Sequence, residues 1–97
     1  MKVYDKSAWQ IDAGVNKGTV AEHFKLLFSW LNSKGLLNEE GIEVYELNSF
    51  SDTSLHEGLL SKEGNVFIGK FYDKLLEEIQ YGNKEVVDYL NDRYINR

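Results

Sequence analysis

The chain has 97 residues, of which 42% are hydrophobic and 28% charged. This composition is typical of a folded protein, and the length allows one hydrophobic core, so we expect a single domain over residues 1–97. Cysteine is absent, which excludes disulfides, thiolate metal sites and thiol nucleophiles. The sequence shows neither the apolar core of a signal peptide nor a run of ~20 apolar residues. We therefore expect a cytoplasmic protein without membrane contact.

The net charge of −5 is concentrated in the middle of the chain. Residues 36–69 hold seven acidic residues and one lysine, a net charge of −6. A negative field repels nucleic-acid phosphates and attracts basic proteins, so we expect a basic protein partner and no nucleic acid. The alternative is a solvated acidic surface that serves solubility alone.

The first 18 residues show no helical period. We expect an extended segment that lies across the helices, anchored by Tyr4 and Trp9. Trp9 is predicted to be largely buried, because an otherwise polar segment needs an apolar anchor to stay ordered.

A helix is predicted over residues 20–34. Thr19 and Glu22 have the spacing of a capping box, and Gly35 is typical of a helix end. Five apolar residues recur at helical spacing and form the predicted buried stripe: Val20, Phe24, Leu27, Phe28 and Leu31.

Residues 36–60 give a weaker pattern. Asn38 is a suitable cap for a short helix through Leu47, but Ile42–Tyr45 also suits a strand, so both structures stay open for residues 39–47. Residues 48–58 are predicted to form a loop, because Asn, Ser, Asp and Thr side chains compete for backbone hydrogen bonds.

A second strong helix is predicted after Ser61, which suits its N-cap, and runs to about Tyr81. Its apolar stripe comprises Ile68, Phe71, Tyr72, Leu75, Leu76 and Ile79. Asn83 then suits the cap of a last helix. The predicted fold is mainly α, a compact three- to four-helix bundle with an extended N-terminal segment, in which Phe28 and Phe71 share one core.

Histidine is the first residue to consider for acid–base chemistry, and the chain has His23 and His56. His23 lies on the flank of a predicted apolar face. It is either a structural side chain that hydrogen-bonds a neighbouring segment or a general base or ligand. No short-range ligand pair, serine-nucleophile motif or glycine-rich phosphate loop is present. We therefore predict no metal, no cofactor and no catalytic residues.

Three blocks of the sequence resemble a family of small uncharacterised bacterial proteins. The blocks are Tyr4-Asp5-Lys6-Ser7-Ala8-Trp9, then His23 with Phe28-Ser29-Trp30 and Gly35-Leu36-Leu37, and finally Glu63-Gly64-Asn65-Val66-Phe67 with Phe71-Tyr72. The chain departs from the family pattern at Gln10, where histidine is usual, and in the proline-free segment 11–17. Such families are often encoded near toxin genes, so the resemblance implies an immunity-like or other protein-binding role.

The leading functional hypothesis is a protein-binding module, in its most concrete form an immunity-type protein that masks a basic toxin or effector surface. Binding residues concentrate on loops and at apolar anchors within charged surroundings. The predicted contact residues are Glu43, Glu46, Phe50, Asp52, Leu55 and Glu57. Alternatively, Phe50 and Leu55 only pin a long loop to the core.

Two other functions stay open. One is a small homo-oligomeric regulatory or housekeeping protein, in which apolar side chains such as Leu26, Trp30 and Tyr89 are buried between copies. The other is an enzyme that uses His23 as a general base.

Overall fold

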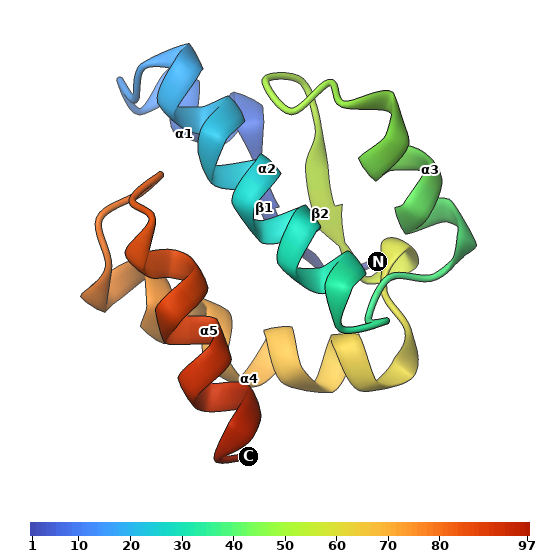
Figure 1. Ribbon diagram of the computed structural model, residues 1–97. Coiled ribbons are helices and arrows are strands. Elements are labelled where there is room, and N and C mark those ends of the chain that lie inside the picture. Colours follow the sequence, from blue (N-terminus) through green and yellow to red (C-terminus); the bar gives the residue numbers. More distant parts are fainter.

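The computed structural model describes residues 1–97 as five α-helices, one 3-10 helix and two short β-strands around a single core (Figure 1). In chain order the elements are β1 (Val3–Lys6), α1 (Ser7–Asp12), α2 (Lys17–Ser33), α3 (Glu39–Leu47), β2 (Ser54–His56), the 3-10 helix η1 (Glu57–Leu59), α4 (Lys62–Glu78) and α5 (Glu85–Ile95). The fold is mainly α, as predicted. The expected bundle of three or four helices is not what forms, because five helices share the core with a small two-stranded antiparallel sheet.

The N-terminal segment is extended only as far as Lys6. β1 pairs antiparallel with β2, with Asp5 opposite Leu55. The chain then turns into α1, which was not predicted because six residues make fewer than two helical turns and show no readable period. Ser7 fixes this junction: its Oγ donates to the Phe50 carbonyl at 3.0 Å and accepts from the Thr53 N–H at 3.1 Å.

The expectation that Trp9 is buried is wrong, because half of its surface (50%) is exposed. Ile11 of the same helix packs against the core. Residues two apart on a helix point in nearly opposite directions, so Trp9 faces solvent when Ile11 faces inward. Tyr4 does dock on a helix as expected, since its hydroxyl donates to Asn65 Oδ1 of α4 at 2.8 Å.

Helix α2 begins earlier than predicted because Asn16, and not Thr19, caps it. The Asn16 Oδ1 accepts from the Gly18 N–H at 2.8 Å and the Thr19 N–H at 3.4 Å. All five side chains of the predicted stripe are fully buried. The helix ends as expected at Gly35, whose φ is +68°, and the Leu36 N–H bonds to the Leu31 carbonyl at 2.9 Å.

Residues 39–47 form a helix, so the strand alternative is wrong. Asn38 caps α3 as proposed, accepting from the Gly41 N–H at 2.9 Å. Gly41 lies directly against the backbone of η1, because a Cβ there would lie 2.1 Å from the Leu59 carbonyl oxygen. The predicted loop 48–58 is a loop only through residue 53. It then contains β2 and enters η1, and three strand residues are too few to recognise without their partner β1.

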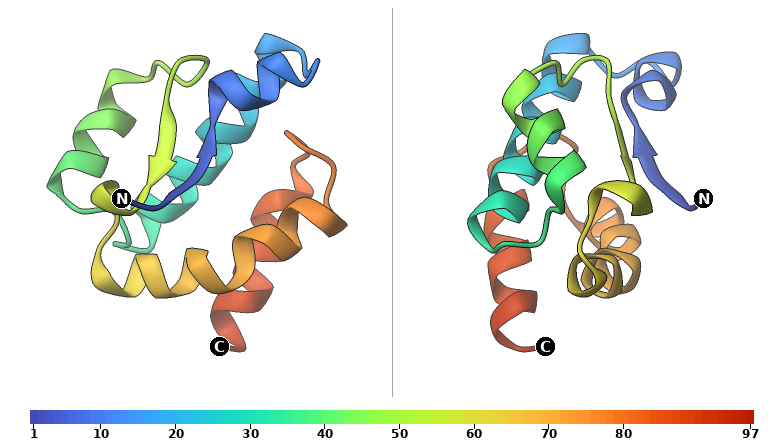
Figure 2. Two further views of the ribbon diagram at one scale, coloured as in Figure 1. Left: turned by 180° about the vertical axis from the view of Figure 1, so that it is seen from behind. Right: turned by 90° about the vertical axis from the view of Figure 1, so that its right-hand side faces the viewer.

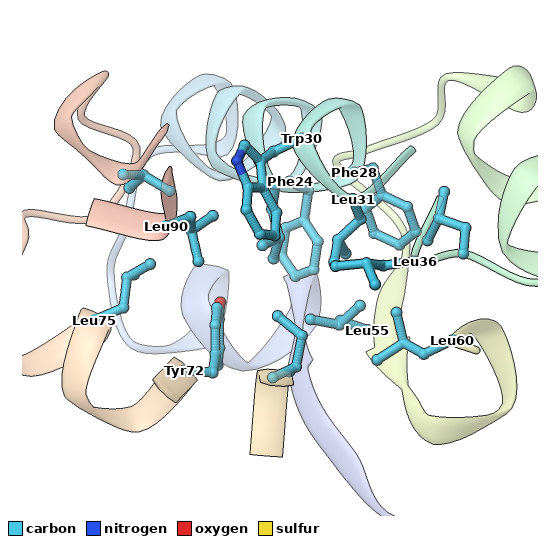
Figure 3. Packing of buried hydrophobic residues seen from close by; sticks show 14 of the residues in the cluster. Phe24, Phe28, Trp30, Leu31, Leu36, Leu55, Leu60, Tyr72, Leu75 and Leu90 are labelled. Carbon is cyan, nitrogen blue, oxygen red and sulfur yellow. The ribbon is translucent and has the colours of Figure 1, made fainter. Parts of the chain in front are cut away.

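Helix α4 is capped by Ser61, whose Oγ accepts from the Gly64 N–H at 3.0 Å, and it ends at Glu78, before the predicted Tyr81. Figure 3 shows the core that α4 shares with α2, with Phe24 and Trp30 on one side and Tyr72 and Leu75 on the other. Phe28 is fully buried in this cluster. Phe71 packs against it but is only half-buried. Helix α5 contacts both α2 and α4.

Candidate functional site

The stretch between Lys34 and Lys62 carries no cationic side chain and six acidic ones. We call residues 35–61 the acidic segment. Its acidic side chains are all exposed: Glu39, Glu40, Glu43, Glu46, Asp52 and Glu57. None forms a salt bridge, since the ion pairs of the chain involve only Arg93 and Arg97 with acidic residues elsewhere. The segment is therefore a source of uncompensated negative potential.

Four of these acids share the outer side of α3 with two apolar side chains. A helix turns about 100° per residue, which places six exposed residues on one side: Glu39, Glu40, Ile42, Glu43, Glu46 and Leu47. We call this surface the α3 face. Leu47 is 73% exposed and Ile42 37%. No other element covers the outer side of α3, which faces the viewer in the right-hand panel of Figure 2.

The opposite side of α3 holds the helix in place. Gly41 is buried, while Val44 and Tyr45 pack against the core, and α3 contacts both α2 and η1. The α3 face is therefore presented on an anchored helix. Glu43, Glu46 and Leu47 line a shallow surface hollow on it.

Two of the predicted contact residues are not on the surface. Leu55 is fully buried and Phe50 is 4% exposed, with the Phe50 ring 5.6 Å from that of Phe28. Both therefore pin the loop to the core, which was the alternative interpretation. Asp52 and Glu57 are exposed but lie outside α3, the first in the loop beside Lys6 and the second on η1.

Ile42 and Leu47 were missed as surface residues. On the helix the two residues lie to either side of the inward-facing Gly41, Val44 and Tyr45. The helical projection of residues 39–47 does contain this signal. It becomes readable only after the strand alternative is excluded.

The apolar side chains suggested for self-association are already used within the chain. Trp30 is 4% exposed, stacks on Phe67 and donates from Nε1 to Asn91 Oδ1 at 2.7 Å. Tyr89 is 8% exposed and Leu26 is half-buried. Trp30 and Tyr89 therefore offer almost no surface to a second copy.

His23 belongs to a buried chain of polar side chains that joins four segments. Its Nδ1 accepts from the Gly82 N–H at 3.0 Å, and its Nε2 lies 2.9 Å from the Tyr72 hydroxyl. That hydroxyl donates to Asp5 Oδ2 at 2.5 Å, and Tyr81 donates to the same oxygen at 3.1 Å. β1, α2, α4 and the α4–α5 turn thus meet at one network, which we call the Asp5 network.

The directions of the hydrogen bonds fix the state of His23. A backbone N–H can only donate, so Nδ1 must be unprotonated. The proton of the neutral ring is therefore on Nε2, which donates a hydrogen bond to the Tyr72 hydroxyl oxygen. Burial lowers the pKa of His23 to about 4, against the opposing effect of Asp5. Burial and the Asp5 carboxylate raise the pKa of Tyr72 and of Tyr81 above the ordinary tyrosine value, so both hydroxyls stay donors.

The central side chains of the Asp5 network are closed off from solvent. His23 is completely buried, and Asp5 and Tyr72 are each 1% exposed. None of the four surface hollows is lined by a member of the network. General-base catalysis needs contact with the substrate proton, so this geometry favours the structural interpretation of His23.

His56 has a different structural role from His23. Its Nδ1 accepts from the Gly58 N–H at 3.0 Å and so caps η1. No group of three or more histidine or acidic side chains is arranged to hold a metal ion.

Of the three blocks that carry the family resemblance, the third contacts both of the others. Tyr4 bonds to Asn65, and Asp5 bonds to Tyr72, which in turn bonds to His23. Trp30 stacks on Phe67 with ring centroids 5.3 Å apart. In this chain these residues therefore hold the N-terminal strand, α2 and α4 together.

Comparison with protein-family models, with curated proteins and with solved structures found no match to this chain. None of its helices combines the length and the apolar character needed to cross a bilayer.

Proposed function

We propose that the protein is a protein-binding module that docks on a basic protein through the α3 face. The observation that carries the proposal is the α3 face, on which four exposed acids without a salt bridge lie beside the exposed Leu47 and Ile42. Apolar side chains surrounded by charged ones are the usual composition of a protein-binding surface, which has an apolar core and a polar rim.

The charges and the apolar side chains have different roles in this proposal. Unpaired acids accelerate the encounter with a cationic surface, and salt weakens this effect because the Debye length is about 8 Å at physiological ionic strength. Full burial of a leucine side chain contributes about 1.5 to 3 kcal/mol. Leu47 and Ile42 therefore replace Phe50 and Leu55 as the proposed apolar anchors.

The experiment is a comparison of two double variants as baits in cells of the source organism. Glu43→Lys with Glu46→Lys alters the α3 face, whereas Asp73→Lys with Glu77→Lys makes the same change in net charge on α4. All four positions are exposed and none takes part in a salt bridge. The native protein and the α4 variant are expected to retain a basic partner that the α3 variant loses. Equal recovery by both variants contradicts the proposal.

The immunity-type form of the proposal makes a further demand on that partner. Expressed alone, the partner should arrest growth, and co-expression of this chain should restore it. Rescue by the α4 variant but not by the α3 variant supports that form. If the partner does not arrest growth, the immunity-type form is wrong and the protein-binding module serves another purpose.

A further inference from the structure

The turn between α4 and α5, residues 79–84, is fastened to α2 through His23. The Gly82 N–H donates to His23 Nδ1 at 3.0 Å, and the Tyr81 ring stacks on the imidazole at 3.6 Å between centroids and 13° between planes. Gly82 has a φ of +79°, and a Cβ there would lie 2.7 Å from Thr19 Cγ2. The turn therefore packs closely on α2, and its backbone is bound there by one hydrogen bond to the His23 imidazole.

Only a neutral His23 fits this arrangement. The Nε2 proton already points to Tyr72, whose own proton goes to Asp5. An additional proton must therefore bind Nδ1, which would set an N–H of the ring against the N–H of Gly82. Two donors cannot share a hydrogen bond, and the buried positive charge would have lost its water.

We propose that residues 79–84 are an acid-released latch, which is closed on α2 while His23 is neutral and detaches when His23 takes up a proton. Detachment removes the clash between the two donors and lets water reach the imidazolium. The proposal does not depend on the α3 face.

Three elements present titratable groups to His23. Asp5 comes from β1, Tyr72 from α4 and Tyr81 from the latch itself. Asp5 favours the imidazolium, but its carboxylate is occupied by Tyr72, Tyr81 and the Gln10 amide at 3.1 Å. Burial has the larger effect and lowers the pKa of His23 to about 4, which places release well below neutral pH.

Hydrogen exchange at the Gly82 amide measures release directly. In the released state His23 regains an ordinary pKa near 6.5, so the opening equilibrium should grow tenfold per pH unit between the two pKa values. Relative to intrinsic exchange, we expect the protection of Gly82 to fall about 80-fold from pH 6.5 to pH 4, because His23 is half-titrated at each of these two pH values, in the open state at one and in the closed state at the other. The Leu27 amide, in the middle of α2, should remain more protected than Gly82 throughout.

His23→Asn is the informative variant, because its side-chain oxygen lies near the position of Nδ1 and cannot be protonated in this range. It should make the protection of Gly82 nearly independent of pH. His56→Asn is the matched control, because His56 Nδ1 also accepts a glycine N–H, that of Gly58 at 3.0 Å. This control should keep the acid response of the native chain.

The proposal is overturned if Gly82 protection does not fall in acid, if the fall persists in a folded His23→Asn variant, or if Gly82 and Leu27 always open together. Should His23→Asn fail to fold, NMR titration of the native protein decides the question. Coincident midpoints of the His23 ring proton and the Gly82 amide support the latch, and titration of the ring without a change at Gly82 refutes it.

Discussion

Removing one oxygen from Tyr72 should destabilise the fold strongly. The hydroxyl is buried and makes two hydrogen bonds, one with His23 Nε2 at 2.9 Å and one to the Asp5 carboxylate at 2.5 Å. A hydrogen bond to a charged group contributes about 1.5 to 3 kcal/mol and one between neutral groups about 0.5 to 1.5 kcal/mol. Tyr72→Phe should therefore lower the free energy of unfolding by about 2 to 4 kcal/mol, and the Tm by about 10 to 30 °C for a domain of this size.

Tyr89→Phe is the matched control for this measurement. The Tyr89 hydroxyl is also buried, but it makes no hydrogen bond, although Glu78 and Arg93 lie nearby. Because no hydrogen bond is lost, its removal should leave the stability unchanged or slightly raised. Both variants are compared with the native chain by urea unfolding, followed by circular dichroism. A loss below 1 kcal/mol for Tyr72→Phe, or equal losses for the two variants, would refute the assignment of the Asp5 network as a major stabilising feature.

Three other outcomes follow from the structure. The pKa of His23 is lowered to about 4 in the folded state, so its contribution to stability is full above the unfolded pKa near 6.5 and declines as pH falls. Between pH 6.5 and 4, the free energy of unfolding measured in urea should fall by about 3 kcal/mol more for the native chain than for His23→Asn. Trp9→Ala should cost less than about 1 kcal/mol, because the side chain is half-exposed; a larger loss in the same assay would show that Trp9 packs inward. In α4, Gly64→Ala should destabilise by about 1 to 3 kcal/mol, because its Cβ would lie 2.4 Å from the Leu36 carbonyl oxygen, whereas Gly69→Ala has room and should stabilise by up to about 1 kcal/mol; thermal melts that rank the two variants the other way would contradict this packing.

The long helices were predictable because their signals are local. The apolar stripe of α2 and the caps Asn38 and Ser61 depend on residues within a few turns, and each was assigned correctly. The two-stranded sheet was not predictable in this way. β2 exists because Asp5 and Lys6 of a distant segment pair with Leu55 and Ser54, and no local pattern in three residues reveals such a partner.

The candidate site was predictable in charge but not in detail. The acidity of the middle segment was evident from composition, but the burial of Phe50 depends on the ring of Phe28, more than 20 residues away. The Asp5 network has the same character, because Asp5 and Tyr72 are separated by 67 positions. The sequence shows that each of these positions carries a polar side chain, but their hydrogen bonds become visible only in the folded structure.

The proposed role of the α3 face is tested most directly by the association rate with the captured partner over a range of salt concentrations. The native protein and the Asp73→Lys, Glu77→Lys variant should associate rapidly at low salt and slow together as salt is added. The Glu43→Lys, Glu46→Lys variant should associate more slowly and show a flatter salt dependence, with thermal stability nearly unchanged. If it associates at the native rate at low salt, the partner does not approach through the α3 face and the proposed function is wrong.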